Sequence, residues 1–425
     1  MSVDTIARKL RKEISDKIDL SGAYSDESFM RCIEETVFQY SGERYLTAKE
    51  RRAIVMAIFH SFRGLDILHP LMEDPAVTEI MINAYDEIFI ERDGSLERFE
   101  GRFESPEKLE DLIQSIVAKV NRAVNESSPI VDARLPDGSR VNVVLPPIAL
   151  KGPTVTIRKF PAHPLTMEDL IDKEAITAEA ARFLGLLVRA KYNIFVGGGT
   201  GSGKTTFLNA LCGYVPSDER IITIEDSAEL QIRGVPNWVR LETRNANTEG
   251  KGAITIRDLI RTSLRMRPNR IIVGEVRGAE AFDMLSAMNT GHDGGLSTAH
   301  SNSVRDMLSR LETMVIIGSG LSAEVVRKQI VSAIDIMVHL SRFRDKTRRV
   351  TEIAEIAGME NGEIRIRPLY VFQERGEDES GRVIGGLVKA GDLERTAKLK
   401  MAGFVAGELW QSAKECGIVI PEQEE

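Results

Sequence analysis

The run NIFVGGGTGSGKTTFLNAL, residues 193–211, restricts the fold of this chain more than any other feature of its sequence. A short apolar stretch enters a glycine-rich loop, and a helical pattern follows the loop. From Gly198 to Thr205 the loop matches G-x-x-x-x-G-K-[ST] without a mismatch. Glycines let backbone N–H groups turn toward phosphate oxygens, and the following helix N-terminus adds a partial positive charge. The run therefore predicts a phosphate-binding strand–loop–helix unit.

The positions within this loop have separate expected roles. Lys204 should reach the β- and γ-phosphates of a nucleotide, and the Thr205 hydroxyl should bind Mg²⁺. The alternative is a glycine-rich turn that binds nothing, which the flanking strand and helix patterns argue against. The predicted nucleotide-binding residues are Gly198, Gly199, Thr200, Gly201, Ser202, Gly203, Lys204, Thr205 and Thr206.

Two further runs place carboxylates directly after apolar, strand-like segments. In RIITIEDSAELQI, residues 220–232, they are Glu225 and Asp226, and in NRIIVGEVRG, residues 269–278, the carboxylate is Glu275. Strand ends beside a phosphate loop are positions where carboxylates hold Mg²⁺ or a water molecule. Asp226 is therefore a second candidate Mg²⁺ ligand, and Glu275 is the candidate group that orients the attacking water. Solvated acidic turns are the alternative.

A glycine-rich run, AMNTGHDGGLSTAHSNS, residues 287–303, supplies a candidate histidine. His300 could donate a hydrogen bond to a γ-phosphate and so respond to its presence. The alternative is a surface histidine in a polar loop. For His292 the two interpretations are equally open.

The order of patterns along the chain predicts an α/β protein with more than one domain. Residues 1–64 suggest a helical N-terminal segment and residues 65–160 a small α+β domain. Residues 161–175 contain prolines and suit a linker. From 176 to 425 strand and helix patterns alternate, which is typical of a parallel sheet covered by helices.

Local signals add detail to these domains. Thr47 and Glu50 form a capping-box pattern at a helix start. The pair Asp93-Gly94 predicts a hairpin turn, and IRIRPLYVFQ predicts an appended antiparallel edge. A basic cluster between residues 342 and 349 is expected to be an exposed hairpin, with a pore or partner contact as the alternative.

Composition limits the classes of protein and partner. A chain of 425 residues is longer than a domain with a single hydrophobic core usually is, so two or three domains are expected. The 56 basic and 64 acidic residues give a formal net charge of −8, which counts against nucleic acid bound across a broad basic face. No apolar run reaches about 18 residues, so we expect no membrane-spanning segment and a cytoplasmic location. Cys32, Cys212 and Cys416 suit a reducing compartment and cannot form a four-cysteine zinc module.

In this order, the runs resemble the ATPases of type II and type IV secretion, a group that includes pilus assembly and retraction motors. There they are called Walker A (GGTGSGKTT), Asp box (TIEDSAEL), Walker B (RIIVGEVRG) and His box (GHDGGLSTAHS). The resemblance covers roughly residues 20 to 415 and looks most like the CpaF-like branch, which serves Flp (tight-adherence) pili. It implies a RecA-like P-loop ATPase domain and a hexamer of bilobed subunits, with ATP bound between the two domains.

The resemblance also implies roles for individual residues. Lys204 and Thr205 match the phosphate and Mg²⁺ positions. Glu275 matches the Walker B glutamate, and His300 matches the His-box histidine. In the family, arginines of the N-terminal domain and linker reach the γ-phosphate, with a surface ion pair as the alternative for each. The remaining matches are Glu225, Asp226 and Glu229 of the Asp box, and Arg134, Arg140 and Arg158.

The function implied is a hexameric ATP-hydrolysing motor that assembles a Flp-type pilus or a related secretion apparatus. It would work at the cytoplasmic face of the inner membrane, docked on a membrane-embedded platform protein. Many type II secretion relatives carry a tetracysteine zinc module, which the single cysteine after residue 212 excludes here. Two alternatives stay open: a type IV secretion or conjugation ATPase that moves DNA or protein, and a nucleotide-gated docking scaffold with slow or no hydrolysis.

Overall fold

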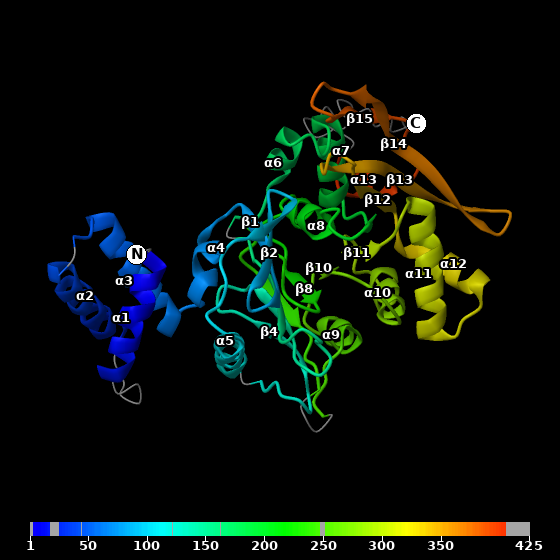
Figure 1. Cartoon of the computed structure of the whole chain (residues 1–425). Coiled ribbons are helices and arrows are strands. Elements are labelled where there is room, and N and C mark those ends of the chain that lie inside the picture. Colours follow the sequence, from blue (N-terminus) through cyan, green and yellow to red (C-terminus); the bar gives the residue numbers. More distant parts are fainter. Residues whose placement is uncertain are drawn as a thin grey trace. The chain divides into compact units, whose positions relative to one another are not determined.

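The computed structural model divides the chain into two compact units, Met1–Ala162 and His163–Glu425 (Figure 1). The structure describes residues 3–17, 25–43, 45–120, 122–161, 163–246 and 251–404. Cys416, one of the three cysteines considered above, lies outside these described residues. Among the described helices, none is long and apolar enough to cross a bilayer.

Three helices at the start of the first unit pack around their own apolar core. They are α1 (Val3–Lys17), α2 (Asp26–Glu43) and α3 (Ala48–Arg63). Leu10, Ile33 and Ile58, one from each helix, are buried together in this core. The capping box predicted at the start of α3 is confirmed, because the Thr47 hydroxyl accepts from the Glu50 N–H and the Glu50 carboxylate accepts from the Thr47 N–H.

An antiparallel sheet with strand order β3-β2-β1-β6-β5-β4 forms the rest of the first unit. The predicted hairpin turn is confirmed, because Asp93 and Gly94 have φ of 49° and 74° between paired strands β2 and β3. Helix α5 packs on the sheet through Ile113, Ile116 and Val117. The elements are η1 (Asp66–Leu68), α4 (His69–Glu73), β1 (Val77–Ala84), β2 (Glu87–Arg92), β3 (Ser95–Phe99), α5 (Pro106–Lys119), β4 (Ile130–Arg134), β5 (Arg140–Val144) and β6 (Thr154–Arg158).

The stretch 161–175, expected to be a linker, contains a helix and needs correction. Helix α6 (Met167–Asp172) begins with a capping box between Thr166 and Asp169. Met167 and Leu170 are buried in the core of the second unit. The prolines at the start of the stretch give a linker composition, but burial of two apolar side chains folds its remainder into the second unit.

The second unit is built on a mixed sheet with strand order β15-β14-β13-β12-β7-β11-β10-β8-β9. The strands from β12 to β9 in this order run parallel, and β13, β14 and β15 extend the sheet antiparallel, as the IRIRPLYVFQ run predicted. The described strands are β7 (Ile194–Gly198), β8 (Ile221–Glu225), β9 (Trp238–Glu242), β10 (Arg270–Val273), β11 (Leu296–His300), β12 (Ile336–Arg342), β13 (Arg348–Glu360), β14 (Glu363–Glu377) and β15 (Val383–Lys389).

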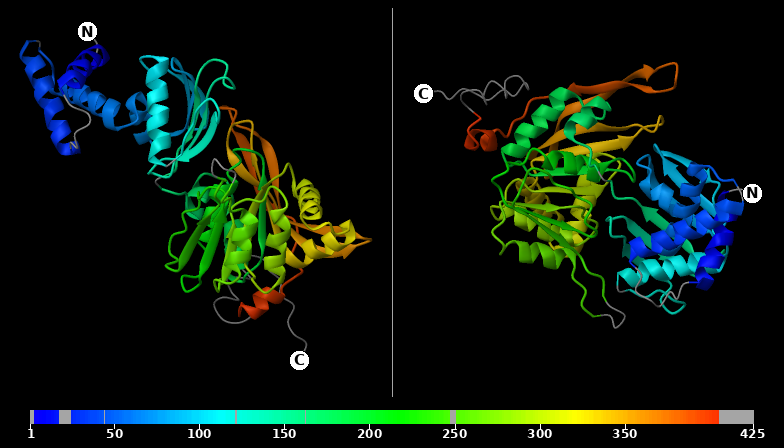
Figure 2. Two further views of the ribbon diagram at one scale, coloured as in Figure 1. Left: turned by 90° about the horizontal axis from the view of Figure 1, so that it is seen from below. Right: turned by 90° about the vertical axis from the view of Figure 1, so that its left-hand side faces the viewer.

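Helices cover both faces of this sheet (Figures 1 and 2). Side chains alternate along β7, so that Ile194 and Val196 join one core and Phe195 joins the other. The first core is shared with α6, α7, α8 and α13, and the second with α9, α10, α11 and α12. These helices are α7 (Ala178–Arg189), α8 (Lys204–Cys212), α9 (Ile256–Ser263), α10 (Glu280–Asn289), α11 (Val304–Ser319), α12 (Ala323–Ala333) and α13 (Ala397–Met401). The architecture is that of a P-loop ATPase fold.

Candidate nucleotide-binding site

The glycine-rich loop joins the end of β7 to the start of α8. Gly201 and Gly203 have φ of +69° and +92°, a left-handed conformation that side chains with a Cβ rarely adopt. A Cβ on Gly198 would lie 2.4 Å from the Ser202 Oγ, so this position also requires glycine. The loop therefore curves at the N-terminus of α8, where the first backbone N–H groups have no intrahelical partners.

Lys204, the first residue of α8, is buried and points back across the loop. Its Nζ donates to the Gly199 carbonyl at 3.0 Å and lies 3.3 Å from Nδ1 of His300. An ammonium group can only donate, so Nδ1 accepts, and the proton of a neutral His300 is on Nε2. Burial and the nearby Lys204 charge lower the pKa of His300, which favours this neutral form.

Glu275 follows β10 and lies on the other side of His300. Its Oε1 is 3.0 Å from Nε2 of His300. This contact is an ion-pair distance and not a hydrogen bond, since Oε1 has no hydrogen-bond partner within the described part of the chain. The structure thus brings Lys204, His300 and Glu275 into one line, although they come from three separate sequence runs.

The Asp-box residues lie at the end of β8 and have different environments. Glu225 is buried, and its Oε1 accepts from the N–H groups of Glu229 and Leu230 at 2.9 and 3.0 Å. Burial raises the pKa of Glu225 to about 7. Asp226 is exposed, and its carboxylate lies 3.9 Å from the Arg277 guanidinium. Glu225 therefore anchors the backbone turn that presents Asp226.

Arg277 joins two of these carboxylates and was not among the sequence candidates. Its Nη2 donates to Oε2 of Glu275 at 2.7 Å, and this bond raises the pKa of Arg277. Its position two residues after Glu275, in the same run, was the available signal. Nearby, the Thr298 hydroxyl donates to the Gly274 carbonyl at 2.8 Å and ties the ends of β10 and β11 together.

The three predicted arginines lie together in the first unit, on one face of its sheet. Arg140 on β5 is directly opposite Arg134 on β4 and Arg158 on β6. Directly opposed residues of antiparallel strands share a face, and like charges in such pairs are destabilising. Glu79 on β1 is 3.9 Å from Arg158. This row of cations, hereafter the arginine row, is an arrangement suited to an anion such as a phosphate.

Buried polar atoms around the loop match the chemistry of a phosphate and metal ligand. Within the described residues, Ser202 Oγ in the loop and Ser301 Oγ, which would lie 2.4 Å from a Cβ on Gly197, are buried without a hydrogen-bond partner. Buried polar groups are normally paired, so these atoms suit a polar ligand. The Thr205 hydroxyl is half-buried in the first turn of α8. Ser202, Lys204 and Thr205 are thus the residues that fit a nucleotide phosphate with Mg²⁺.

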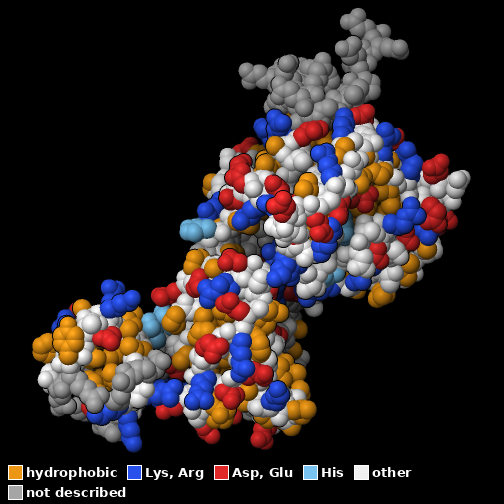
Figure 3. All heavy atoms as spheres, turned by 45° about the horizontal axis from the view of Figure 1, so that its top comes forward, with side chains coloured by type: hydrophobic (Ala, Val, Ile, Leu, Met, Phe, Trp, Pro, Cys, Tyr) orange, Lys and Arg blue, Asp and Glu red, His pale blue; other side chains and the backbone are white. Residues whose placement is uncertain are grey.

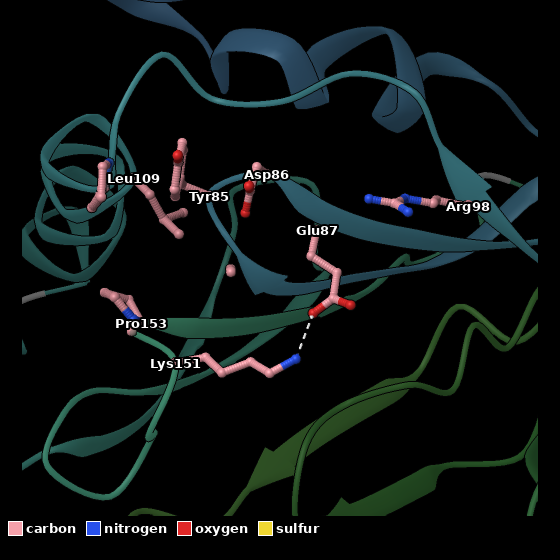
Figure 4. A pocket seen from close by; sticks show the side chains of 10 residues that line it. Tyr85, Asp86, Glu87, Arg98, Leu109, Lys151 and Pro153 are labelled. Atoms are coloured by element: carbon pink, nitrogen blue, oxygen red, sulfur yellow. Dashed lines mark hydrogen bonds and ion pairs between the residues drawn. The ribbon is translucent and has the colours of Figure 1, made fainter.

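A pocket of about 470 Å³ lies elsewhere, in the first unit (Figure 4). Tyr85, Asp86, Arg98 and the ion pair between Lys151 and Glu87, 3.4 Å long, contribute to its lining. None of the residues expected to act on a nucleotide lines it. Its charges are mixed, as they are over the molecular face in Figure 3, where basic and acidic side chains are interspersed. The residues expected to bind a nucleotide therefore lie at the glycine-rich loop and not at this pocket.

The mixed sheet, the loop between β7 and α8 and the carboxylates at neighbouring strand ends define a nucleotide-binding protein of the RecA-like P-loop class. Residues 62–376 match the family described as "Type II/IV secretion system protein". The chain belongs to this family, and the resemblance seen in its motifs is confirmed.

Two relatives and one solved structure show which proteins of known name this chain is similar to. A putative conjugal transfer protein of Mycobacterium tuberculosis is 36% identical over 334 residues, covering 77% of this chain and 94% of that protein. The type IV secretion system protein VirB11 of Brucella suis is 33% identical over 318 residues, covering 68% and 88%. The solved structure of the Yersinia pseudotuberculosis ATPase DotB is similar in fold, with a TM-score of 0.50, 18% identity, and coverage of 70% and 79%.

Proposed function

We propose that this chain is an ATP-hydrolysing motor of a secretion, conjugation or pilus-assembly apparatus. The observation that carries the proposal is the line from Lys204 through His300 to Glu275 beside the glycine-rich loop. A cation for the phosphates and a carboxylate that can orient water are groups that phosphoryl transfer to water uses, and His300 lies between them. Names of family relatives, which include secretion system and conjugal transfer proteins, support the same class.

Each residue of the line has a part in the proposed hydrolysis. Lys204 would exchange its bond to the Gly199 carbonyl for the β- and γ-phosphates, and Thr205 would hold Mg²⁺, which neutralises phosphate charge when bound. Glu275, with one oxygen held by Arg277, would present its other oxygen to the attacking water. His300 would contact the γ-phosphate side of the site and connect its state to Glu275.

The arginine row supplies the remaining charge in this proposal. We assign Arg134, Arg140 and Arg158 to the γ-phosphate, where a planar guanidinium can spread positive charge over several oxygens. In the proposed hexamer, binding and hydrolysis of ATP would be coupled to conformational change of the subunits. Such a ring would work at the inner membrane on a platform protein.

Lys204→Ala tests the proposal directly. Removing the ammonium group should abolish ATP hydrolysis, because no other described group occupies its place in the line. The measurement is ATP hydrolysis by the purified full chain, followed with radiolabelled ATP or with a coupled assay. A variant as active as the wild type would show that hydrolysis does not occur at this loop.

The cargo separates the pilus motor from a conjugation or secretion ATPase. The assignment to a Flp pilus rests on the sequence of the motifs. The conjugal transfer and type IV secretion relatives favour a conjugation or secretion ATPase at least equally. ATPase rates with and without single-stranded DNA distinguish them. Strong stimulation by DNA would favour conjugation, and stimulation only by a pilus platform protein would favour the pilus. Absence of turnover with lipid and partner present would favour a nucleotide-gated scaffold.

A further inference from the structure

A hairpin from the far end of the second unit reaches the glycine-rich loop. Strand β12 runs parallel to β7 and ends beside it, with Leu340 paired to Gly198. Directly after the hairpin turn, Nε of Arg348 donates to the Gly201 carbonyl at 2.8 Å. The basic cluster of residues 342–349 is therefore not simply an exposed hairpin, as its sequence suggested, because one of its arginines contacts the loop.

The peptide group that Arg348 contacts is shared with the next residue. In a trans peptide, the Gly201 carbonyl and the Ser202 N–H belong to one plane and point in opposite directions. A cation that fixes the oxygen therefore also fixes the direction of the N–H. The Ser202 N–H now makes only a long contact, 3.4 Å, to the Gly199 carbonyl. The Ser202 N–H can therefore exchange this long contact for a hydrogen bond to a stronger acceptor, such as a phosphate oxygen.

The contact also changes the strength of the donor. Hydrogen bonds to charged groups are shorter and stronger than neutral ones, and a carbonyl polarised by a cation makes its own peptide N–H a better donor. Gly201 is in the left-handed conformation, so its peptide groups can adopt orientations that other residues avoid. An external hydrogen bond selects one of those orientations before a ligand arrives.

We propose that Arg348 is a positioning residue for the phosphate loop. It holds the Gly201–Ser202 peptide with the Ser202 N–H directed to a nucleotide phosphate, and it acts through the backbone without touching the ligand. The proposal rests on the function proposed above, since it requires a nucleotide at this loop. Within the β12–β13 hairpin this role belongs to Arg348, whose Nε contacts the loop.

Arg344 offers a matched control within the same hairpin. It is an arginine four positions earlier, and it is paired with Glu374 and Glu377 on β14. Arg344→Ala removes the same charge and side-chain length as Arg348→Ala from the same hairpin, without removing a contact to the loop. A general effect of hairpin charge or hairpin packing would appear in both variants.

The experiment measures ADP affinity and ATPase kinetics for the full chain and its variants. Arg348→Ala is expected to raise the Kd for ADP and the KM for ATP at least about tenfold, the range for losing a charge-assisted hydrogen bond. kcat should change less than about threefold, because an amide bound equally to substrate and transition state affects binding alone. Arg348→Lys should recover most of the affinity, and Arg344→Ala should match the wild type.

The outcomes separate failure of this proposal from failure of the proposed function. A wild-type chain that binds no ADP contradicts the proposed function itself. Wild-type binding with an equal Kd for Arg348→Ala contradicts only the positioning role, as does an equal loss in Arg344→Ala. Arg348→Met covers the case in which the alanine variant does not fold, since it keeps a long apolar side chain but has no donor for the Gly201 carbonyl. An unchanged Kd for that variant would also overturn the proposal.

Discussion

Charged groups at the candidate site form one continuous series of neighbours. Lys204 leads to His300, then to Glu275, Arg277 and Asp226, with separations between 2.7 and 3.9 Å. Each charge in the series has an opposite charge or a neutral imidazole beside it. Loss of one member therefore leaves a partner uncompensated, and substitutions that keep shape but remove charge are the most informative.

Glu275→Gln keeps the side-chain shape and removes the carboxylate that would orient water. Hydrolysis should fall about 100-fold or more, the scale of a lost general base, while ADP binding stays within about threefold. Steady-state ATP turnover and equilibrium ADP binding are the measurements. Glu324→Gln, at an exposed helical ion pair with Lys328, is the matched control and should retain full activity. Wild-type turnover by Glu275→Gln would remove Glu275 from the mechanism.

At the scale of elements, the capping box at the start of α3 is expected to stabilise the helix through hydrogen bonds between neighbouring residues. Thr47→Ala removes the hydroxyl that accepts from the Glu50 N–H at the start of α3. The free energy of unfolding should fall by about 1 kcal/mol, the typical cost of losing an N-cap. Urea unfolding followed by circular dichroism measures it. Thr313→Ala, at an exposed position of α11, is the control and should change stability by less than about 0.5 kcal/mol. Equal losses would contradict a capping effect.

Two histidines at the junction of α3 and α4 predict a pH effect on stability. The rings of His60 and His69 stack with centroids 3.5 Å apart, and burial together with the charge of His69 lowers the pKa of His60 below its ordinary 6.5. As the pH falls below 6.5, unfolded His60 takes up a proton that the folded group resists. Stability should therefore decrease as pH falls from 6.5 toward the lower folded pKa.

Melting temperatures of the wild type and His60→Gln at pH values of about 7.5 and 5.5 check this expectation. The wild type should lose more stability on acidification than His60→Gln does. His163→Gln removes an exposed histidine and should behave like the wild type. Equal losses in all three proteins would mean that the stacked pair makes no contribution to the pH dependence.

At the scale of the whole molecule, the prediction concerns the assembly of several copies of this chain into a ring. The proposed function implies a ring of six subunits, and each subunit would contribute one arginine row and one glycine-rich loop. The full chain should form a hexamer when ATP and Mg²⁺ are present, measured as the mass of the complex by light scattering. The Lys204→Ala variant tests whether assembly needs bound nucleotide. A monomer under every condition would contradict the ring mechanism.

Net charge is a property of the whole molecule that describes its site poorly. The chain carries a formal −8, yet three arginines oppose one another on one small sheet and Lys204 is buried at the loop. On the face in Figure 3 both signs of charge are mixed. Local arrangement of charge, and not the sum, therefore determines which ligand the surface attracts.

Local sequence determined those parts of this protein whose physics is contained in a few neighbouring residues. The left-handed turns at Gly201 and Gly203, the capping box at Thr47 and the hairpin turn at Asp93 need only backbone conformation and nearby hydrogen bonds. The alternation of strands and helices predicted the α/β class for the same reason. These features were therefore predictable without any knowledge of tertiary contacts.

Tertiary structure decided the contacts between residues that are distant in sequence. Arg348 and Gly201 are 147 positions apart, and only the parallel pairing of β12 with β7 brings the hairpin to the loop. The strand register likewise aligned Arg134, Arg140 and Arg158, and burial of Met167 made part of the expected linker helical. Such contacts depend on which faces pack and which strands pair, and these depend on free energy summed over the whole core, not on any single run of residues.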